Sequence, residues 1–266
     1  MASREFSTLG YEKMFNPVLQ KTCLAEFVDY KVNEKHNKPP YFKIMERYNL
    51  EGPPLKQLSI NTRVLTADEF DKRHKSGMQI LDTRSPEAIC GTYIPNSLAI
   101  PLNMIPAFAG WFLSYKEPIG IIASSGEEVA TAIKHLYRLG YDDIAGYLGS
   151  GLHQWEVEGK EYCDIPAIYI SNVVSMLESK DDFILLDVRS KEEYDEKHLP
   201  NSKNIYIGHL PEHINELDKN KKIVTFCGSG RRAIIAASIL KTNGFEDVEN
   251  CLGSMMACKK VGCPTE

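Results

Sequence analysis

Short apolar runs alternate with stretches of helical periodicity along this chain. Residues 183–188 form an apolar run that leads into a charged pair, and residues 223–226 form a second run rich in β-branched side chains. Runs of this length and composition predict buried strands of a parallel sheet. Residues 232–242 follow the second run and place three apolar side chains on one helical face, which predicts a helix packed on that sheet.

Capping and turn residues indicate where such elements begin and end. Gly244 stands where a left-handed residue would end the helix, and residues 245–248 predict a further short strand. Residues 191–197 are polar and compatible with a helix, residues 66–69 form a capping-box pattern, and Gly77 stands where that earlier helix should end. Strands that alternate with helices predict an α/β fold, with a parallel sheet flanked by helices.

Four segments occur twice in the same order. The two copies lie 105 residues apart for the first two segments and 104 residues apart for the other two. The pairs are residues 80–85 and 185–190, 94–97 and 199–202, 140–144 and 244–248, and 148–150 and 252–254. This period is the size of a small domain. It therefore predicts two tandem domains, at residues 61–162 and 163–266, after an N-terminal segment of residues 1–60.

Composition and charge narrow the functional class. Of the 266 residues, 43% are hydrophobic and 25% are charged, which is typical of a globular chain of about two domains. The net charge of −5, with only short basic groups, gives no sign of a nucleic-acid or membrane partner. No apolar stretch approaches the ~18 residues that span a membrane, and seven scattered cysteines do not form a disulfide framework. We therefore expect a cytoplasmic protein with reduced thiols.

The loop that begins at Cys227 carries the strongest chemical signal. It joins a predicted strand to a predicted helix, so it lies at the carboxyl edge of the sheet and at a helix N-terminus. Gly228 and Gly230 permit backbone conformations in which successive N–H groups converge on one anion. The helix dipole and the charges of Arg231 and Arg232 add positive potential. Together these features stabilise a thiolate, which is a nucleophile.

Two other interpretations of Cys227 have to be weighed. A cysteine at a strand end is often only a small buried apolar side chain. Phosphatase or arsenate reductase chemistry would suit a cysteine followed by five residues and then an arginine. Here Arg232 stands one position closer and Ala233 occupies the place of that arginine. The shorter loop suits a single sulfur atom better than a tetrahedral oxyanion.

The C-terminal part of the chain resembles rhodanese domains in the order and spacing of its motifs. These motifs are residues 187–189, 193–194, 198–202, 227–233 and 252–255. The resemblance is strong over about residues 165–266 and weaker over about residues 62–160. One departure is Cys258, which stands where many rhodanese domains have tryptophan.

This resemblance implies a sulfurtransferase with Cys227 as its catalytic residue. The thiolate would take a sulfane sulfur from thiosulfate or a low-molecular-weight persulfide and pass it, as a cysteine persulfide, to a thiol acceptor. Asp187 and Arg189 would form a structural ion pair near the edge of the sheet. The loop residues expected to hold the sulfur donor are Gly228, Ser229, Gly230, Arg231 and Arg232.

The first copy lacks the residues of this chemistry. When the copies are aligned, Ala123 stands opposite Cys227, and Glu127 and Glu128 stand opposite the two loop arginines. A loop with two carboxylates would repel a thiolate or thiosulfate. We therefore predict that residues 61–162 form an inactive rhodanese-like domain, used for packing or for binding a partner.

The N-terminal segment resembles another family. Residues 7–13, 16–17, 39–45 and 49–52 look like the end of a metallo-β-lactamase-fold domain, of the persulfide dioxygenase type that is fused to rhodanese domains. The His-x-His-x-Asp-His motif that binds iron in that family is absent, so we expect no dioxygenase activity, no metal and no cofactor. The segment has a predicted helix at residues 24–31, but it is too short and too rich in proline for a core of its own.

Two further patterns bear on metals and on the function class. Residues 209–213 match a zinc-protease signature, but Pro211 breaks the continuous helix that such a site needs. Cys251, Cys258 and Cys263 lack the paired spacing of a zinc site, although any of them could be a second thiol near the loop. The alternative to an enzyme is a persulfide sensor, or a docking module for a separate metallo-β-lactamase-fold partner. Turnover distinguishes these classes, because a sensor would be persulfidated once and would not cycle.

Overall fold

The computed structural model describes residues 6–34, 37–53, 63–149 and 151–266. Ser150 of the repeat, and residues 54–60 of the N-terminal segment, lie outside this described part. The chain divides into two compact units, Met1–Lys38 and Pro39–Glu266. The first contains α1 (Leu9–Phe15), the 3₁₀ helix η1 (Pro17–Gln20) and α2 (Leu24–Asn33). α2 covers the helix predicted at residues 24–31, and none of these elements contains a buried residue.

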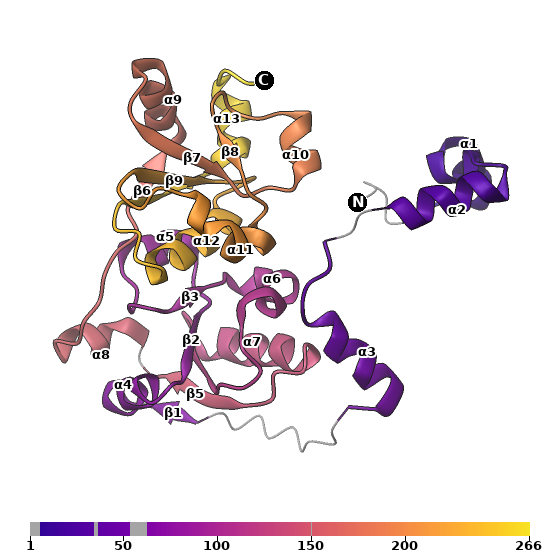
Figure 1. Ribbon diagram of the computed structural model, residues 1–266. Coiled ribbons are helices and arrows are strands. Elements are labelled where there is room, and N and C mark those ends of the chain that lie inside the picture. The colour runs from indigo at the N-terminus through magenta and orange to yellow at the C-terminus, as the bar shows by residue number, and fades with distance from the viewer. Residues whose placement is uncertain (1–5, 35–36, 54–62, 150) are drawn as a thin grey trace. The chain divides into compact units, whose positions relative to one another are not determined.

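The second unit contains two five-stranded parallel sheets flanked by helices (Figure 1). The strands of the first sheet are β1 (Val64–Leu65), β2 (Gln79–Asp82), β3 (Leu98–Ala99), β4 (Ile119–Ile122) and β5 (Ile144–Leu148). Those of the second are β6 (Ala167–Tyr169), β7 (Phe183–Asp187), β8 (Lys203–Asn204), β9 (Lys222–Phe226) and β10 (Val248–Leu252). The strand order is β1-β5-β4-β2-β3 in one sheet and β6-β10-β9-β7-β8 in the other, which is the same order. The predicted α/β fold class is confirmed.

The helices follow a similar order around each sheet, and the second sheet has one additional 3₁₀ helix, η4. After α3 (Phe42–Glu51), the first sheet carries α4 (Ala67–Lys75), α5 (Pro86–Gly91), η2 (Leu102–Met104), α6 (Ile105–Phe112), α7 (Gly126–Arg138) and α8 (Gly151–Val157). The second carries α9 (Ile170–Ser179), α10 (Lys191–Glu196), η3 (Ile207–His209), α11 (Leu210–His213), η4 (Ile214–Glu216), α12 (Arg231–Thr242) and α13 (Ser254–Val261). No helix in the described ranges is long and apolar enough to cross a membrane.

The repeated segments take the same local geometry in both halves of this unit. Asn96 and Asn201 both adopt the left-handed backbone conformation, with φ of 61° and 59°. The serine that follows each asparagine donates a hydrogen bond to the carbonyl three residues earlier, at 2.5 Å for Ser97 and 2.6 Å for Ser202. The similarity of the repeated segments is therefore similarity of backbone as well as of residue type.

The capping residues in the sequence correctly predict where α4 begins and ends. Thr66 and Glu69 form a capping box at the start of α4, and that helix ends just before Gly77, whose φ is +100°.

The strand predicted at residues 245–248 is wrong, because β10 begins only at Val248. Phe245 is buried in the turn instead, where its N–H group donates to the carbonyl of Leu240 and closes the end of α12.

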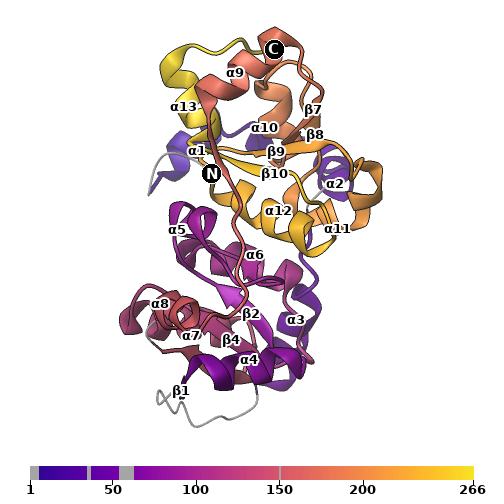
Figure 2. The same ribbon diagram turned by 90° about the vertical axis from the view of Figure 1, so that its left-hand side faces the viewer.

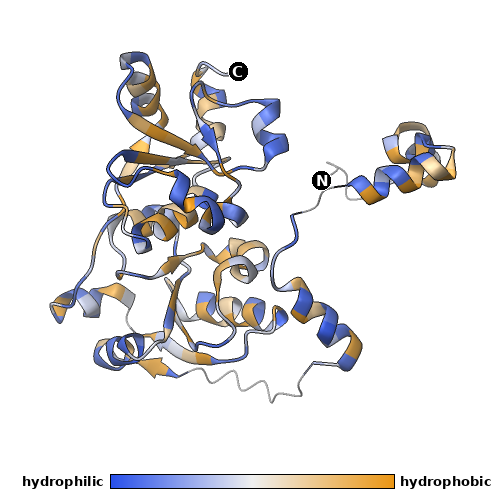
Figure 3. Cartoon of the chain, in the orientation of Figure 1, coloured by the Kyte–Doolittle hydropathy of each residue, from blue (hydrophilic) through white to orange (hydrophobic). Residues whose placement is uncertain are grey.

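Helix α12 is buried far more completely than its sequence pattern predicts. Every residue from 233 to 240 is buried, whereas the apolar periodicity predicts a single buried face. The cause is that α12 lies between its own sheet and the first half of the unit, where it contacts β3 and α5 (Figures 1 and 2). The hydroxyl of Ser238 accepts a hydrogen bond from the N–H group of Ala99 across this contact, at 3.1 Å. By contrast, α10 is hydrophilic and has no buried residue (Figure 3).

Candidate active site

Cys227 is the first residue after β9, at the carboxyl edge of the second sheet. Its loop turns into α12 at Gly230, whose φ of +89° is a conformation that residues with a Cβ atom rarely adopt. A Cβ atom at Gly230 would also lie only 3.2 Å from the carbonyl oxygen of Cys251. The glycine is therefore required both by the turn and by the close approach of the neighbouring strand. The side chain of Cys227 is 1% exposed.

The thiol of Cys227 accepts a backbone hydrogen bond. The N–H group of Gly230 donates to Sγ at 3.2 Å. The N-cap of α12 is Gly230 itself, so no side chain caps the helix, and its first turn contains no acidic residue. The helix start beside Cys227 is therefore a place where backbone N–H groups can bind negative charge.

The start of α13 holds the same loop from the other side. Ser254 Oγ accepts a hydrogen bond from the N–H group of Cys227 at 3.2 Å and donates one to the carbonyl of Cys251 at 2.6 Å. The N–H groups of Met255 and Met256 donate to the carbonyls of Cys227 and Gly228, at 3.1 and 2.9 Å. Sequence reasoning missed this role of Ser254, although its motif is one of those that occur twice.

Arg232 approaches the loop, but its charge is shared with a carboxylate. Its guanidinium donates two hydrogen bonds to Glu193, at 2.5 and 2.8 Å. Burial disfavours the charged form of Arg232, but the hydrogen bonds with Glu193 and the nearby carboxylates of Glu193 and Asp187 raise its pKa. Arg232 is therefore a cation held in a fixed position beside the loop by its ion pair with Glu193. Sequence reasoning quoted Glu193 as part of a motif and missed this contact.

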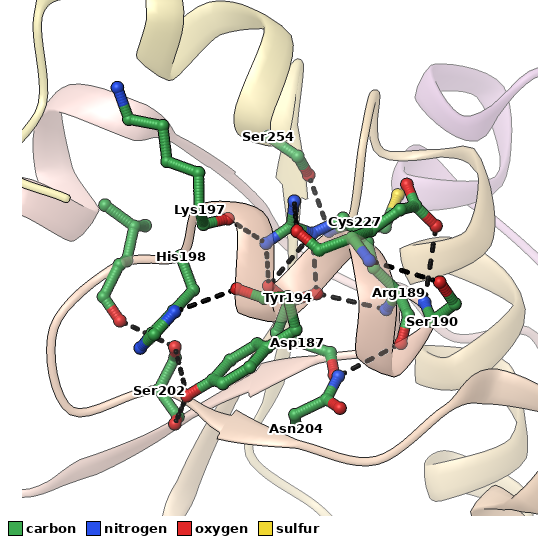
Figure 4. A network of polar contacts seen from close by, with 12 residues as sticks. Asp187, Arg189, Ser190, Tyr194, Lys197, His198, Ser202, Asn204, Cys227 and Ser254 are labelled. Carbon is green, nitrogen blue, oxygen red and sulfur yellow. Dashed lines mark hydrogen bonds and ion pairs between the residues drawn. The ribbon is translucent and has the colours of Figure 1, made fainter. Parts of the chain in front are cut away.

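Asp187 and Arg189 form a buried ion pair behind the loop (Figure 4). The two side chains meet at 2.6 Å, with Asp187 0% exposed and Arg189 5% exposed. Arg189 also donates to the backbone carbonyls of Glu193 and Lys197, at 3.1 and 2.8 Å. The pair therefore holds α10 at the backbone of Glu193 and at its C-terminal end, and the Glu193 carboxylate binds Arg232.

Arg231 lies on the exposed side of the same turn and lines a pocket of about 610 Å³. Residues from both halves of the unit form the walls. The second half contributes Ser229, Arg231 and Met256, and the first half contributes Thr83, Arg84, Ser85, Pro86, Glu87, Pro101, Leu102, Asn103, Glu128, Thr131 and His135. The mouth of the Cys227 loop thus faces the carboxyl edge of the first sheet, a neighbourhood that the sequence did not indicate.

The corresponding loop of the first half has a different internal arrangement. Ala123 follows β4 directly, as Cys227 follows β9. Ser125 caps α7, and the carboxylate of Glu128 accepts a hydrogen bond from the N–H group of Ser124 at 3.0 Å. A carboxylate of the chain itself therefore occupies the anion position of this loop.

The remaining thiols and histidines form no comparable site. Burial raises the pKa of Cys90 to about 11 and that of Cys251 to about 12, which disfavours their thiolates. Within residues 6–34, 37–53, 63–149 and 151–266, no group of three or more His, Cys, Asp or Glu side chains is placed to hold a metal ion. His209 is the N-cap residue of the four-residue helix α11 and His213 is its last residue, with Pro211 near its start.

Comparison with known proteins identifies relatives of the second half. A family model described as "Rhodanese-like domain" matches residues 171–260. The putative sulfur carrier protein YrkF of Bacillus subtilis is 36% identical over 91 residues, which cover 34% of this chain and 49% of that protein. This chain thus spans about half the length of that relative. The putative sulfurtransferase YtwF of the same organism is 35% identical over 94 residues, covering 35% of this chain and 90% of that protein.

Two other matches extend this picture. Thiosulfate sulfurtransferase GlpE of Coxiella burnetii is 29% identical over 83 residues, which cover 31% of this chain and 78% of that protein. Among solved structures, a rhodanese-related protein from Thermoplasma volcanium is 26% identical, with a TM-score of 0.35, and the match covers 38% of this chain and 96% of that chain.

Proposed function

The chain belongs to the rhodanese-like family, and on that premise we propose that it moves sulfane sulfur to a thiophilic acceptor through a persulfide on Cys227. The donor would be thiosulfate or a low-molecular-weight persulfide. The observation that carries the proposal is the hydrogen bond from the Gly230 N–H group to Cys227 Sγ at the uncapped start of α12. That geometry offers a backbone donor to negative charge on the sulfur of Cys227.

The reaction has two displacement steps. The Cys227 thiolate attacks the sulfane sulfur of the donor, the donor's sulfur–sulfur bond breaks, and sulfite or a thiolate leaves with the bonding electron pair. The enzyme now carries a persulfide, whose terminal charge the N–H groups of residues 228–232 would stabilise. An acceptor thiolate then attacks the terminal sulfur, and the Cys227 thiolate leaves in the same way. No external oxidant is required, because the sulfane sulfur keeps its oxidation state throughout.

The neighbouring charges have separate tasks in this proposal. Arg232, held by Glu193, supplies a cation of fixed position beside the sulfur. Arg231 makes no ion pair with any described residue, and it would attract an anionic donor or acceptor into the pocket between the halves. Asp187 and Arg189 have an indirect, positioning role, because they hold α10 in place and do not contact the thiol.

We further propose that the first half is a second, inactive rhodanese-like domain. The same strand order, the same left-handed asparagine and the same type of Asp–Arg ion pair, at 2.6 Å between Asp82 and Arg84, support this assignment. Its task would be to complete the pocket in front of the Cys227 loop. A metallo-β-lactamase-fold dioxygenase domain is the partner that the N-terminal segment suggests.

The decisive experiment is mass spectrometry of the reduced protein after incubation with thiosulfate. We expect the parent to gain one sulfur atom, mapped to Cys227 and removed by cyanide. Cys227→Ser should gain none. Cys251→Ser, which removes a buried cysteine of the adjacent strand, is the matched control and should load like the parent.

Cycling separates an enzyme from a sensor. With an excess of thiosulfate and a thiol acceptor, the parent should release many equivalents of sulfite for each protein chain. A single equivalent would favour the sensor, and the absence of any adduct at Cys227 would refute the sulfurtransferase proposal.

A further inference from the structure

Helix α13 ends in a turn that brings two cysteines together. Gly262 adopts a left-handed conformation, with φ of +71°, directly after the helix. The carbonyl of Cys258 accepts hydrogen bonds from the N–H groups of Gly262 and Cys263, at 3.0 and 3.3 Å. The bond from Cys263 is the six-residue bond of a Schellman motif, in which the side chains at its two ends come into contact. In this chain both of those side chains are thiols.

The two thiols differ in their access to solvent. Cys258 is 1% exposed and packs in a core cluster with Phe226, Cys251 and Met255. Cys263 is only partly buried and packs against the same cluster. Burial, and next the hydrogen bond with Cys263, raise the pKa of Cys258 to about 12. Cys263 is therefore the thiol that a reagent reaches first, and Cys258 is the buried thiol hydrogen-bonded to it.

The C-terminal tail is held in a position that preserves this contact. The N–H group of Glu266 donates to the carbonyl of His198, and the N–H group of His198 donates to the carbonyl of Glu266, both at 2.9 Å. This pair of bonds anchors the tail three residues beyond Cys263. The two thiols are thus held together from both sides, by the helix end and by the anchored tail.

We propose that Cys258 and Cys263 form a modification site that low-molecular-weight persulfides convert to an internal disulfide. The Cys263 thiolate attacks the terminal sulfur of the persulfide, a thiolate leaves, and Cys263 becomes a persulfide. The Cys258 thiol loses its proton as it attacks Sγ of Cys263, and the terminal sulfur leaves with the bonding electron pair as hydrosulfide. Two cysteine thiols are oxidised to a disulfide and one sulfane sulfur is reduced to sulfide, so the electrons balance.

The position of the crosslink connects it to the Cys227 loop. The start of α13 binds that loop through Ser254, Met255 and Met256, and the end of α13 would be tied to the tail. The tail is in turn paired with His198, next to the segment that follows α10. The disulfide would therefore restrain the helix that holds the loop when sulfane sulfur is abundant.

The test treats the reduced full-length protein with an excess of glutathione persulfide. Free thiols are then alkylated in denaturant, and the protein is digested with trypsin. Lys259 and Lys260 lie between the two cysteines, so the peptides stay joined only if the disulfide has formed. We expect a joined pair that lacks two hydrogen atoms and separates on treatment with dithiothreitol. Cys23, an exposed cysteine at the start of α2, is the internal control and should carry sulfur without an intramolecular crosslink.

Two variants make the outcome decisive. Cys263→Ser removes the partly exposed thiol and should abolish the joined peptides. Cys227→Ser should retain them, so that failure of this proposal and failure of the sulfurtransferase proposal are distinguishable. Accumulation of a persulfide on Cys263 while Cys258 remains alkylated would overturn the assignment, and so would loss of the crosslink in Cys227→Ser.

Discussion

The loops that follow β4 and β9 occupy the same place in two sheets of the same strand order, but their N–H groups bind different partners. After β4, Ser125 caps the helix and the Glu128 carboxylate accepts a hydrogen bond from the N–H group of Ser124. After β9, no side chain caps the helix, and Cys227 Sγ accepts a hydrogen bond from the N–H group of Gly230. The difference teaches that the same strand-to-helix turn leaves backbone N–H groups at the loop in both halves. The side chains of each loop decide which group accepts them.

The Asp–Arg pairs show the opposite case, because they are alike in both halves. Arg84 and Arg189 each bind the aspartate two residues earlier, and each donates to a backbone carbonyl eight residues later. A feature that persists in the loop without a nucleophile cannot depend on the sulfur chemistry. It belongs to the scaffold that both loops share.

The largest expected effect comes from an attempt to transfer the nucleophile. In a Cys227→Ser background, Ala123→Cys should load sulfur from thiosulfate at least about a hundredfold more slowly than the parent, because Glu128 fills the anion position and repels the donor. The rate of sulfur gain by mass spectrometry measures this. Loading within tenfold of the parent rate would mean that the Glu128 carboxylate is no obstacle.

The next effect tests the cation beside the second loop. Arg232→Glu should slow sulfur loading by roughly 10- to 100-fold, equivalent to about 1.4 to 2.8 kcal/mol, because it replaces the fixed cation with an anion that repels both Glu193 and the thiolate. Lys134→Glu makes the same charge change on the exposed surface of α7 and is the matched control. Equal rates for the two variants would refute the role of Arg232.

A third comparison separates scaffold from chemistry. Asp82→Asn and Asp187→Asn should each lower the free energy of unfolding by roughly 3–5 kcal/mol, because each leaves a largely buried arginine without its partner. Urea denaturation measures this loss. Of the two, only Asp187→Asn should also slow sulfur loading, through displacement of α10 and Glu193. If Asp82→Asn slowed loading as strongly as it destabilised the protein, the effect would be one of global stability.

The smallest expected effect is on the stability of the protein at acidic pH. The hydrogen bond from Arg232 outweighs burial and holds the pKa of Glu193 below its ordinary value of 4.5. Because the folded-state pKa lies below the unfolded one, the stabilisation by this pair is present above about pH 4.5 and is lost as the pH falls through the lowered pKa. The stability difference between the parent and Glu193→Gln should therefore be constant near neutral pH and shrink in acid. Urea denaturation across this range would test it, and a difference that grew in acid would contradict the sign.

Most local structure of the second half was predictable from sequence. The strands predicted at residues 183–188 and 223–226 correspond to β7 and β9, each within one residue at its ends, and the helix after the Cys227 loop begins within one residue of its predicted start. The error at residues 245–248 has a physical cause. The turn after Gly244 buries an aromatic residue without being a strand, and an apolar pattern alone does not distinguish the two.

The sequence by itself determined most of the elements and the residues of the Cys227 loop, because these depend on interactions between residues close together in the chain. Only the tertiary structure decided that Glu193 shares the charge of Arg232, although 39 residues separate them. It likewise decided that α12 is buried on all sides and that the first half lines the pocket before the loop. Those features depend on how the elements pack. Packing brings together side chains that are far apart in the sequence, and no local sequence pattern predicts such contacts.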